Sequence, residues 1–384
     1  TAADLLARGI APGDRVIIHL ENCPEFLLLW FGCAYAGAVA VTTNTRSTAD
    51  DIGYFATHSL AVAAFTEPTH ADAVRAALPA SAWLEIVEPG AGLTSKGDPA
   101  SLPERTHDPL APFGIQYTSG TTARPKAVLW SHANALWGAR VSAMHETLQP
   151  DDVHLVFLPL FHTNAQVYSV LASLWAGATI VLQPRFSVSR FWDVAVRNAC
   201  TWTSIVPFCA MALLERPAPV EHSFRFFGAA ILLPAIEERF GVRTVTWWGM
   251  TETVTHGIVG SPNHSPAPMG MGFASPCYEI LVLDADMRPA ELGEVGDLYV
   301  RGRRGLSLFV EYAGDPEATR NAFTHDGLFI TGDRVRMGAD GTLFFVERAK
   351  DVLKIGGENV AASEIERVIA GVTGVREVAV AAIG

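Results

Sequence analysis

The chain has 384 residues, 40 of them acidic and 28 basic, and therefore a formal net charge of −12. This balance argues against a nucleic-acid-binding surface, because contacts with phosphates need clustered Lys and Arg side chains. With 49% hydrophobic and only 18% charged residues, the chain can bury a large core and does not belong to the disordered class.

The first part of the chain predicts strands that alternate with helices. Apolar, β-branched residues predict a strand over 16–20, followed by a helix over 25–36 and a strand over 37–42. The apolar stretch 26–41 is short for a membrane span and rich in Gly and Ala, so we favour a buried core helix over a membrane segment. Because Thr1 is not an initiator Met, we expect the natural N-terminus to lie further upstream.

The alternation continues after a polar segment near 88–112. We predict strands at 113–118, 153–158, 179–182, 203–206, 224–227 and 243–247. We predict helices at 131–145, capped by Ser131, and at 164–175, 189–199, 207–215 and 233–240. This order is typical of an α/β fold with mostly parallel sheets covered by helices on both faces.

The pattern changes after about Gly270, where strands and turn residues follow one another and no helix is indicated before Asp315. We therefore predict a β-rich subdomain over about 270–347. The last segment predicts a strand, a helix and a second strand, which is too little to close a domain. We expect residues 348–384 to be the hinge and the start of a truncated α+β domain.

A loop rich in hydrogen-bond donors follows the strand at 113–118. It contains four hydroxyl side chains, a Gly and a Lys, at Thr118, Ser119, Gly120, Thr121, Thr122 and Lys126. Backbone N–H and hydroxyl groups in such a loop suit the oxygens of a polyphosphate. The Gly-Lys-Ser/Thr of a Walker A loop is absent, and taken alone the segment also fits a solvated turn.

This loop resembles the phosphate-loop signature of the adenylate-forming enzymes, the superfamily of acyl-CoA synthetases, firefly luciferase and the adenylation domains of peptide synthetases. The family usually has Gly where Ala123 and Ala127 stand. Further motifs follow in the family's order along essentially the whole chain. The resemblance implies a large domain over 1–347, with two doubly wound sheets and the β-rich subdomain, before the small domain.

The next motifs resemble the family's acid and adenine sites. The pair Phe161-His162 resembles the segment that lines the acyl pocket, and the loop that packs against adenine corresponds to Gly228, Ala229 and Ala230. The family's Tyr-Gly-x-Thr-Glu sequence corresponds to Trp247, Trp248, Gly249, Met250, Thr251 and Glu252. The resemblance implies that Trp248 stacks on adenine and that Glu252, with Thr121, binds Mg²⁺. It assigns the catalytic roles to Lys126, His162, Thr251 and Glu252.

The last motifs resemble the ribose site and the hinge. By resemblance, Asp333 accepts hydrogen bonds from the ribose hydroxyls, Arg348 contacts the ribose and Lys350 is the pivot of the small domain. Lys354 and the pair Gly356-Gly357 then belong to the cofactor site, where the glycines leave room for the pantetheine chain of CoA. The family's adenylation Lys lies near the end of the small domain, beyond Gly384.

The resemblance implies an acyl-CoA ligase that uses ATP, Mg²⁺ and CoA to activate a carboxylic acid. Two alternatives stay open: an adenylation domain that loads a carrier protein, and an inactive nucleotide-binding homologue. For the acid pocket we expect His162, Val206, Pro207, Trp247 and 255–257, a mixed set that fits short, medium or aryl acids. Five scattered cysteines without a C-x-x-C pair fit a reducing cytoplasm, and a homo-oligomer is compatible with the sequence.

Overall fold

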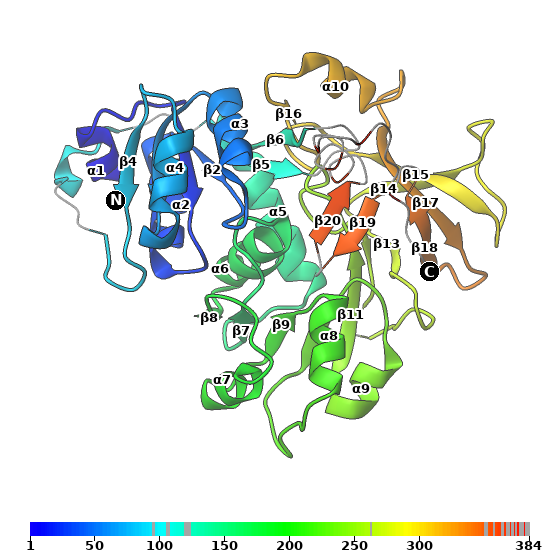
Figure 1. Ribbon diagram of the computed structural model, residues 1–384. Coiled ribbons are helices and arrows are strands. Elements are labelled where there is room, and N and C mark those ends of the chain that lie inside the picture. Colours follow the sequence, from blue (N-terminus) through cyan, green and yellow to red (C-terminus); the bar gives the residue numbers. More distant parts are fainter. Residues whose placement is uncertain are drawn as a thin grey trace.

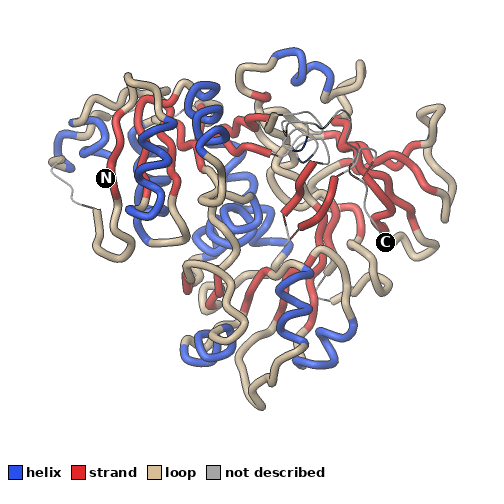
Figure 2. Tube along the Cα trace, in the orientation of Figure 1, coloured by secondary structure: helices blue, strands red, loops and turns tan. Residues whose placement is uncertain are grey.

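The computed structural model describes residues 1–93, 97–104, 108–118, 124–261, 263–348, 352–355 and 358–361, and five single residues after them. Two seven-stranded sheets and a four-stranded sheet form the framework of the described chain (Figure 1). Figure 2 shows that helices accompany the two large sheets, whereas the C-terminal part is mostly strands and loops. This is the predicted fold class.

The first sheet has the strand order β16-β6-β5-β2-β1-β3-β4. The strands from β5 to β4 in this order are parallel, and β6 and β16 are added antiparallel at one edge. Its strands are β1 (Arg15–His19), β2 (Val39–Thr42), β3 (Ala61–Thr66), β4 (Trp83–Ile86), β5 (Pro112–Thr118), β6 (Lys126–Ser131) and β16 (Glu311–Tyr312). The helices of this part are α1 (Ala2–Ala7), α2 (Pro24–Ala36), α3 (Ala49–Ser59) and α4 (Ala71–Ala77), with 3₁₀ turns η1 (Pro68–His70) and η2 (Pro99–Ser101).

Helix α2 occupies most of the apolar stretch 26–41, for which the sequence analysis considered a buried core helix and a membrane segment. Pro24 stands in its first turn, where a missing N–H costs nothing, and the helix ends at Gly37. Phe26, Trp30 and Cys33 are buried on one face of the helix, and β2 follows directly. The core-helix interpretation is confirmed. Among the described residues, no helix is both long enough and apolar enough to cross a membrane.

The second sheet has the order β13-β12-β11-β10-β9-β7-β8, with the five strands from β11 to β8 parallel. Its strands are β7 (Val153–Val156), β8 (Thr179–Leu182), β9 (Trp202–Ser204), β10 (Phe226–Ala229), β11 (Arg243–Trp248), β12 (Ile258–Val259) and β13 (Phe273–Ala274). The helices of this part are α5 (His132–His145), η3 (Asn164–Leu171), α6 (Ala172–Ala176), α7 (Phe191–Arg197), α8 (Pro207–Leu214) and α9 (Pro234–Phe240).

Helices α5 and η3 illustrate one success and one error of the sequence prediction. Ser131 caps α5 as expected, since its side chain accepts from the Asn134 N–H while the Asn134 side chain accepts from the Ser131 N–H. The predicted helix at 164–175 exists, but its first eight residues, 164–171, are a π-helix. A π-helix places the side chains of this wider segment differently from a regular helix, and such segments often occur at functional sites.

The C-terminal part contains the expected antiparallel sheet, with the order β14-β15-β17-β18. Its strands are β14 (Glu279–Leu283), β15 (Val295–Arg301), β17 (Phe329–Met337) and β18 (Leu343–Arg348), and α10 (Pro316–Asn321) precedes β17. No helix lies between Gly270 and Asp315, a range that the structure describes in full. The predicted β-rich subdomain is therefore present.

The segment that predicted one strand over 352–360 instead forms two. Strands β19 (Val352–Ile355) and β20 (Glu358–Ala361) pair antiparallel as a hairpin. The Gly-Gly pair that separates them lies outside the described residues, as does most of the helix and strand expected after Ala361. The division into domains at 347 and 348 stays a prediction.

Candidate functional site

A large cavity of about 2700 Å³ lies where the carboxyl ends of several parallel strands meet the C-terminal subdomain. Thr42 ends β2, Thr118 ends β5 and Trp248 ends β11, and all three residues line this cavity. Ligands of open α/β sheets bind at such carboxyl edges, where strand ends and their following loops present polar groups. This cavity is the candidate active site.

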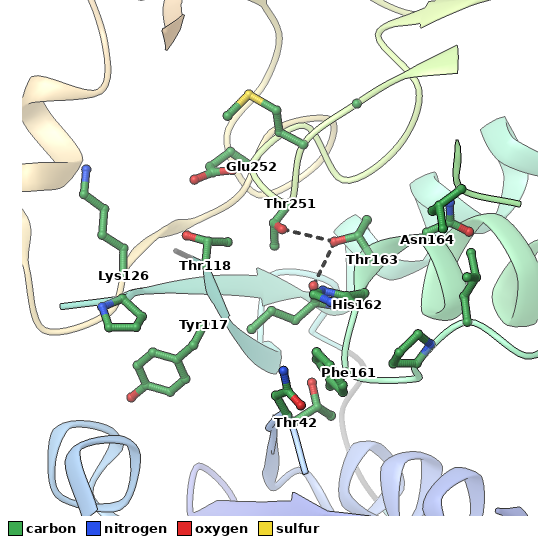
Figure 3. A pocket seen from close by; sticks show the side chains of 18 of the residues that line it. Thr42, Tyr117, Thr118, Lys126, Phe161, His162, Thr163, Asn164, Thr251 and Glu252 are labelled. Atoms are coloured by element: carbon green, nitrogen blue, oxygen red, sulfur yellow. Dashed lines mark hydrogen bonds between the residues drawn. The ribbon is translucent and has the colours of Figure 1, made fainter. Parts of the chain in front are cut away.

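The expected phosphate and metal residues line one part of this cavity. Figure 3 shows Thr118, Lys126, Thr251 and Glu252 arranged around the same space. The Lys126 ammonium lies over the Tyr312 ring, 4.5 Å from its centre. The Tyr312 hydroxyl in turn donates to Glu252 Oε1 at 2.8 Å. One tyrosine side chain thus contacts a cation with its ring and a carboxylate with its hydroxyl.

Two backbone contacts fix the turn that carries Glu252, whose side chain is only 5% exposed. The Trp130 indole N–H donates to the carbonyl of Thr251 at 2.9 Å, and the backbone N–H of Phe309 donates to the carbonyl of Glu252 at 2.9 Å. The first contact comes from the first sheet and the second from the segment before β16. Because both partners belong to other elements, the turn after β11 is set by tertiary structure.

A chain of buried polar side chains continues from Thr251 into the first sheet. The Thr163 hydroxyl lies 3.2 Å from that of Thr251 and 2.8 Å from Gln116 Oε1 (Figure 3). Gln116 contacts Gln166 in η3, and Gln166 donates to the Thr42 hydroxyl at 3.1 Å. Such a satisfied network is rigid, because each member would lose a partner if another moved. This network connects the turn after β11, η3 and two strands of the first sheet. We call it the polar floor of the cavity.

His162, the expected acyl-pocket residue, presents its ring to the cavity (Figure 3). The side chain is accessible from the cavity, but the surrounding protein disfavours its charged form and lowers its pKa to about 4. His162 is therefore neutral at pH 7. A neutral imidazole can exchange hydrogen bonds without adding a charge to a site that receives polyanions.

The expected adenine and ribose residues contact each other directly. The Trp248 indole N–H donates to Asp333 Oδ2 at 2.8 Å, although 85 residues separate them in the sequence. Trp248 lacks the hydroxyl of the tyrosine that the family's motif has at this position, but its indole N–H donates a hydrogen bond instead. Both side chains line the cavity, and both are more than 90% buried.

A bulge in β17 brings Asp333 to this position. Asp297 and Tyr299 of β15 pair with Arg334 and Ile330 of β17, so three residues of β17 lie opposite one residue of β15. Gly332, in the middle of these three, has a φ of 74°, which a residue with a Cβ adopts only at a cost. The Thr-Gly-Asp sequence thus forms a bulge inside a strand rather than a hairpin turn.

The loop expected to contact adenine lies only partly at the cavity. Ala230 lines it, but Gly228 and Ala229 are not among the lining residues. The Trp247 ring covers Gly228 so closely that a Cβ built there would lie 1.7 Å from Trp247 Cη2. The glycine therefore accommodates a protein side chain, and contact between Gly228 and a bound ring is not supported.

The expected acid-pocket set divides in a similar way. His162, Val206, Pro207 and Trp247 line the cavity, as do Gly249 and Met250 of the motif. The stretch 255–257 does not line it, so that part of the expectation is wrong. Thr255 and His256 are fully buried behind the wall that Trp247 forms.

Several predicted residues lie outside the described residues. These are Ser119, Gly120, Thr121, Thr122, Lys350, Gly356 and Gly357, together with the side chains of Arg348 and Lys354. The backbone of Arg348 is described, and in the β17–β18 pairing it lies opposite Asp333. This register is compatible with two ribose-binding residues on neighbouring strands.

Sequence reasoning missed Tyr312, Thr163 and Gln116. Thr163 directly follows the Phe161-His162 motif, and this place in the sequence was a signal for a residue near the site. Tyr312 and Gln116 stand in no recognisable motif, and only the fold brings Tyr312 to Glu252 and Gln116 to Thr163.

Comparisons with known proteins agree with this geometry. The model of the AMP-binding enzyme family matches residues 1–312. The chain belongs to this family. A crotonobetaine/carnitine–CoA ligase of Escherichia coli is 35% identical over 391 aligned residues, covering 94% of this chain and 74% of that protein. The enzyme with the same description from Shigella sonnei is 34% identical, with the same coverage.

Solved structures of the family have the same fold. ATP-bound MatB from Rhodopseudomonas palustris superposes with a TM-score of 0.80 at 28% identity, over 98% of this chain and 76% of that one. A double mutant of o-succinylbenzoate CoA synthetase from Bacillus subtilis gives a TM-score of 0.87 at 26% identity, over 98% and 77%. This member of the AMP-binding family is therefore an AMP-forming acid–thiol ligase of the acyl-CoA synthetase group.

Proposed function

We propose that the protein activates a carboxylic acid with ATP as an acyl-adenylate and then transfers the acyl group to CoA. The observation that carries this proposal is the convergence of Lys126, Glu252 and the Trp248–Asp333 pair on one cavity. One region offers a cation for phosphates and a carboxylate for their metal ion, and the other offers an aromatic ring and a carboxylate for a nucleoside. The names of the related CoA ligases support the choice of acceptor.

In the first step, a carboxylate oxygen of the acid attacks the α-phosphorus of ATP. The bond between that phosphorus and the bridging oxygen breaks, and pyrophosphate leaves with the bond's electron pair. Lys126 is suited to bind phosphate oxygens, and its contact with Tyr312 limits the range of its ammonium group. The protein contributes mainly orientation and charge neutralisation, which is the usual basis of catalysis in phosphoryl-type transfers.

In the second step, the CoA thiol loses its proton to solvent and attacks the acyl carbonyl. The carbon–oxygen bond to AMP breaks, so that a thioester and AMP are formed. We assign the orientation of the acyl group in both steps to His162 and Trp247, which line the cavity. The neutral imidazole of His162 can hydrogen-bond to the acyl group without attracting the negative phosphates.

The residues around Glu252 fit a magnesium ion bound together with the phosphates. A carboxylate beside the hydroxyls of Thr118 and Thr251 is a set of hard oxygen ligands, the kind that Mg²⁺ prefers. When bound, the ion would neutralise charge on the phosphates. Tyr312 orients the Glu252 carboxylate by donating to Oε1.

The acid itself is a small to medium carboxylic acid in this proposal. The lining residues Val206, Pro207 and Trp247 offer apolar and aromatic surface beside His162. The related ligases act, by their names, on crotonobetaine and carnitine, so these two acids are the first to test.

The test is acid-dependent exchange of labelled pyrophosphate into ATP by the full-length natural protein, followed by thioester analysis. We expect exchange only when a suitable acid is present, and acyl-CoA only when CoA is added. Exchange without CoA consumption, combined with loading of a carrier protein, would favour the carrier-protein alternative. Failure of a broad acid panel to support any exchange, despite tight AMP binding, would identify an inactive homologue.

A further inference from the structure

Trp247 packs against two other aromatic rings. Its ring is stacked on His256, with centroids 4.6 Å apart and planes 16° apart, and it is parallel to Trp202, at 6.2 Å and 10°. Trp202 and His256 are fully buried, and of the three rings only Trp247 lines the cavity. A cavity-wall residue therefore packs against two buried rings that do not line the cavity.

The edges of the Trp247 ring are restricted as well. One edge lies on Gly228, where even a methyl group would collide with it. Tyr168 of the π-helix packs against Trp247 with ring centroids 5.6 Å apart and planes at 67°, and Tyr168 also lies 4.1 Å from the His256 ring. Gly228, Tyr168, Trp202 and His256 thus all contact the Trp247 ring, and His256 gives the shortest ring contact among them.

A second buried residue stands behind His256. Glu146 Oε1 lies 3.9 Å from His256 Nε2, and neither side chain has a hydrogen-bond partner among the described residues. His145, whose ring is 5.7 Å from that of His256, is held by the Ser275 hydroxyl at 3.1 Å. Burial raises the pKa of Glu146 well above its usual value and lowers that of His256 well below its own, so the protein interior disfavours the charged form of each group.

Buried polar atoms without partners reduce stability, and apolar side chains of similar shape would avoid that cost. Stability alone therefore does not account for this pair. Its place directly behind the wall of the acid pocket suggests a role in the shape of that pocket.

We propose that His256 and Glu146 are positioning residues that hold Trp247 in place and thereby set the size of the acid that the pocket accepts. This inference rests on the proposed function, since it treats the part of the cavity beside Trp247 as the acid site. His256 acts by filling the space behind the Trp247 ring. Glu146 acts by closing the space behind His256. Without the imidazole, the Trp247 ring can tilt backward and the pocket becomes deeper.

The test uses non-reactive acyl-adenylate mimics, acyl-sulfamoyl adenosines from acetyl to octanoyl, with binding measured by calorimetry. We expect His256→Ala to raise the affinity for octanoyl relative to acetyl by about tenfold or more, a change that calorimetry resolves easily. The affinity for AMP alone should stay within about twofold, because Trp248 and Asp333 are unchanged. If His256→Ala does not fold, His256→Leu replaces the flat ring with a flexible side chain and should shift the ratio in the same direction.

His154→Ala is the matched control. His154 is an equally buried histidine at the far end of the ring series, 5.8 Å from Trp202, and it has no ring contact with Trp247. This variant should lose stability and keep the wild-type ratio of octanoyl to acetyl affinity. The same shift in both histidine variants would overturn the proposal, because it would reflect general loosening of the core.

Glu146 is tested by a pair of substitutions. Glu146→Ala should shift the ratio in the same direction as His256→Ala, and Glu146→Gln, which keeps the shape, should restore the wild-type ratio. An unchanged ratio in Glu146→Ala would remove Glu146 from the proposal, and an unchanged ratio in both His256 variants would overturn it entirely. If no mimic binds more tightly than AMP to the wild-type protein, the proposed function fails instead.

Discussion

The indole N–H of Trp248 donates to Asp333 Oδ2 at 2.8 Å and so joins the last parallel strand of the second sheet to the bulge of the C-terminal subdomain. In the proposed function, the face of Trp248 stacks on adenine while Asp333 accepts from the ribose hydroxyls. Since one side chain orients the other, the base and the sugar would be recognised by a single unit.

Substitution of this pair tests that relationship. We expect Asp333→Ala to weaken AMP binding at least about tenfold, because hydrogen bonds to a charged group contribute roughly 1.5–3 kcal/mol each. Trp248→Phe keeps an aromatic face but loses the N–H, and a smaller loss of about three- to tenfold is expected. Calorimetry with AMP measures both effects. Asp286→Ala, an exposed position in the same subdomain, serves as the control and should bind AMP like the wild type.

Glu252 provides the second prediction. Glu252→Gln should lower the rate of pyrophosphate exchange by at least about a hundredfold, because the loss of a metal ligand removes several kcal/mol of transition-state stabilisation. Tyr312→Phe removes only the donor to Oε1 and should raise the Mg²⁺ concentration needed for half-maximal exchange. The neighbouring exposed Glu311→Gln is the control. Wild-type exchange by Glu252→Gln at limiting Mg²⁺ would contradict the assignment.

The Trp248–Asp333 pair and Glu252 also show how much of the candidate site the sequence predicts. The Trp248–Glu252 motif and Asp333 were recognisable from local sequence, and the structure brings them to one cavity. Their mutual contact was not predictable, because it depends on a bulge centred on Gly332 and on the packing of two sheets. A local motif indicates which residue types are present, whereas the partner of each side chain depends on segments far away in the chain.

The π-helix and the polar floor of the cavity were beyond sequence analysis for similar reasons. Apolar periodicity distinguishes a helix from a strand but does not separate an α-helix from a π-helix over eight residues. The series from Thr251 through Thr163, Gln116 and Gln166 to Thr42 connects four separate segments, and no spacing rule relates them. For the same reason the prediction for 255–257 was wrong. The nearby motif in the sequence suggested that this stretch lines the pocket, whereas its packing places it behind the pocket wall.

Two buried carboxyl groups are expected to respond oppositely to the same substitution. Burial raises the pKa of Glu146 well above its usual value, so its ionisation in the unfolded chain favours unfolding at neutral pH. Burial would also raise the pKa of Glu25, but backbone N–H groups of Gly90 and Gly92 donate to it and lower the pKa instead. Glu25 is therefore stabilised in its ionised form.

We expect Glu146→Gln to raise the free energy of unfolding at pH 7.5 by about 1 kcal/mol or more, since one pKa unit corresponds to about 1.4 kcal/mol. The gain should shrink as the pH falls toward 4.5, where the unfolded carboxyl is protonated too. Glu25→Gln should instead destabilise by about 1–2 kcal/mol, because the hydrogen bonds that Oε1 accepts from Gly90 and Gly92 lose their charge and the amide nitrogen cannot accept the Gly90 N–H as Oε2 does. Urea unfolding at both pH values tests the pair, and a loss of stability in Glu146→Gln at pH 7.5 would show that its carboxylate is ionised in the folded protein.

The last prediction concerns the buried histidines. Burial lowers the pKa of His19 and His145 to about 4 and that of His154 to about 3, against an ordinary value of 6.5. A histidine whose pKa is lowered in the folded protein binds its proton more readily in the unfolded chain. Each such histidine therefore leaves stability unaffected above pH 6.5 and reduces it as the pH falls from 6.5 toward 4, by about 1.4 kcal/mol per pH unit.

The effect can be isolated by comparing His154→Gln with the wild type. Urea unfolding at pH 7.5, 6 and 5 should show that the variant loses stability less steeply below pH 6.5, because one proton-binding site is missing from its unfolded chain. Glu146 acts in the opposite direction over this range, but its contribution cancels in the comparison. The exposed His325→Gln, the control, should follow the wild-type slope. Equal slopes for His154→Gln and the wild type would mean that His154 takes up its proton in the folded protein as readily as in the unfolded chain.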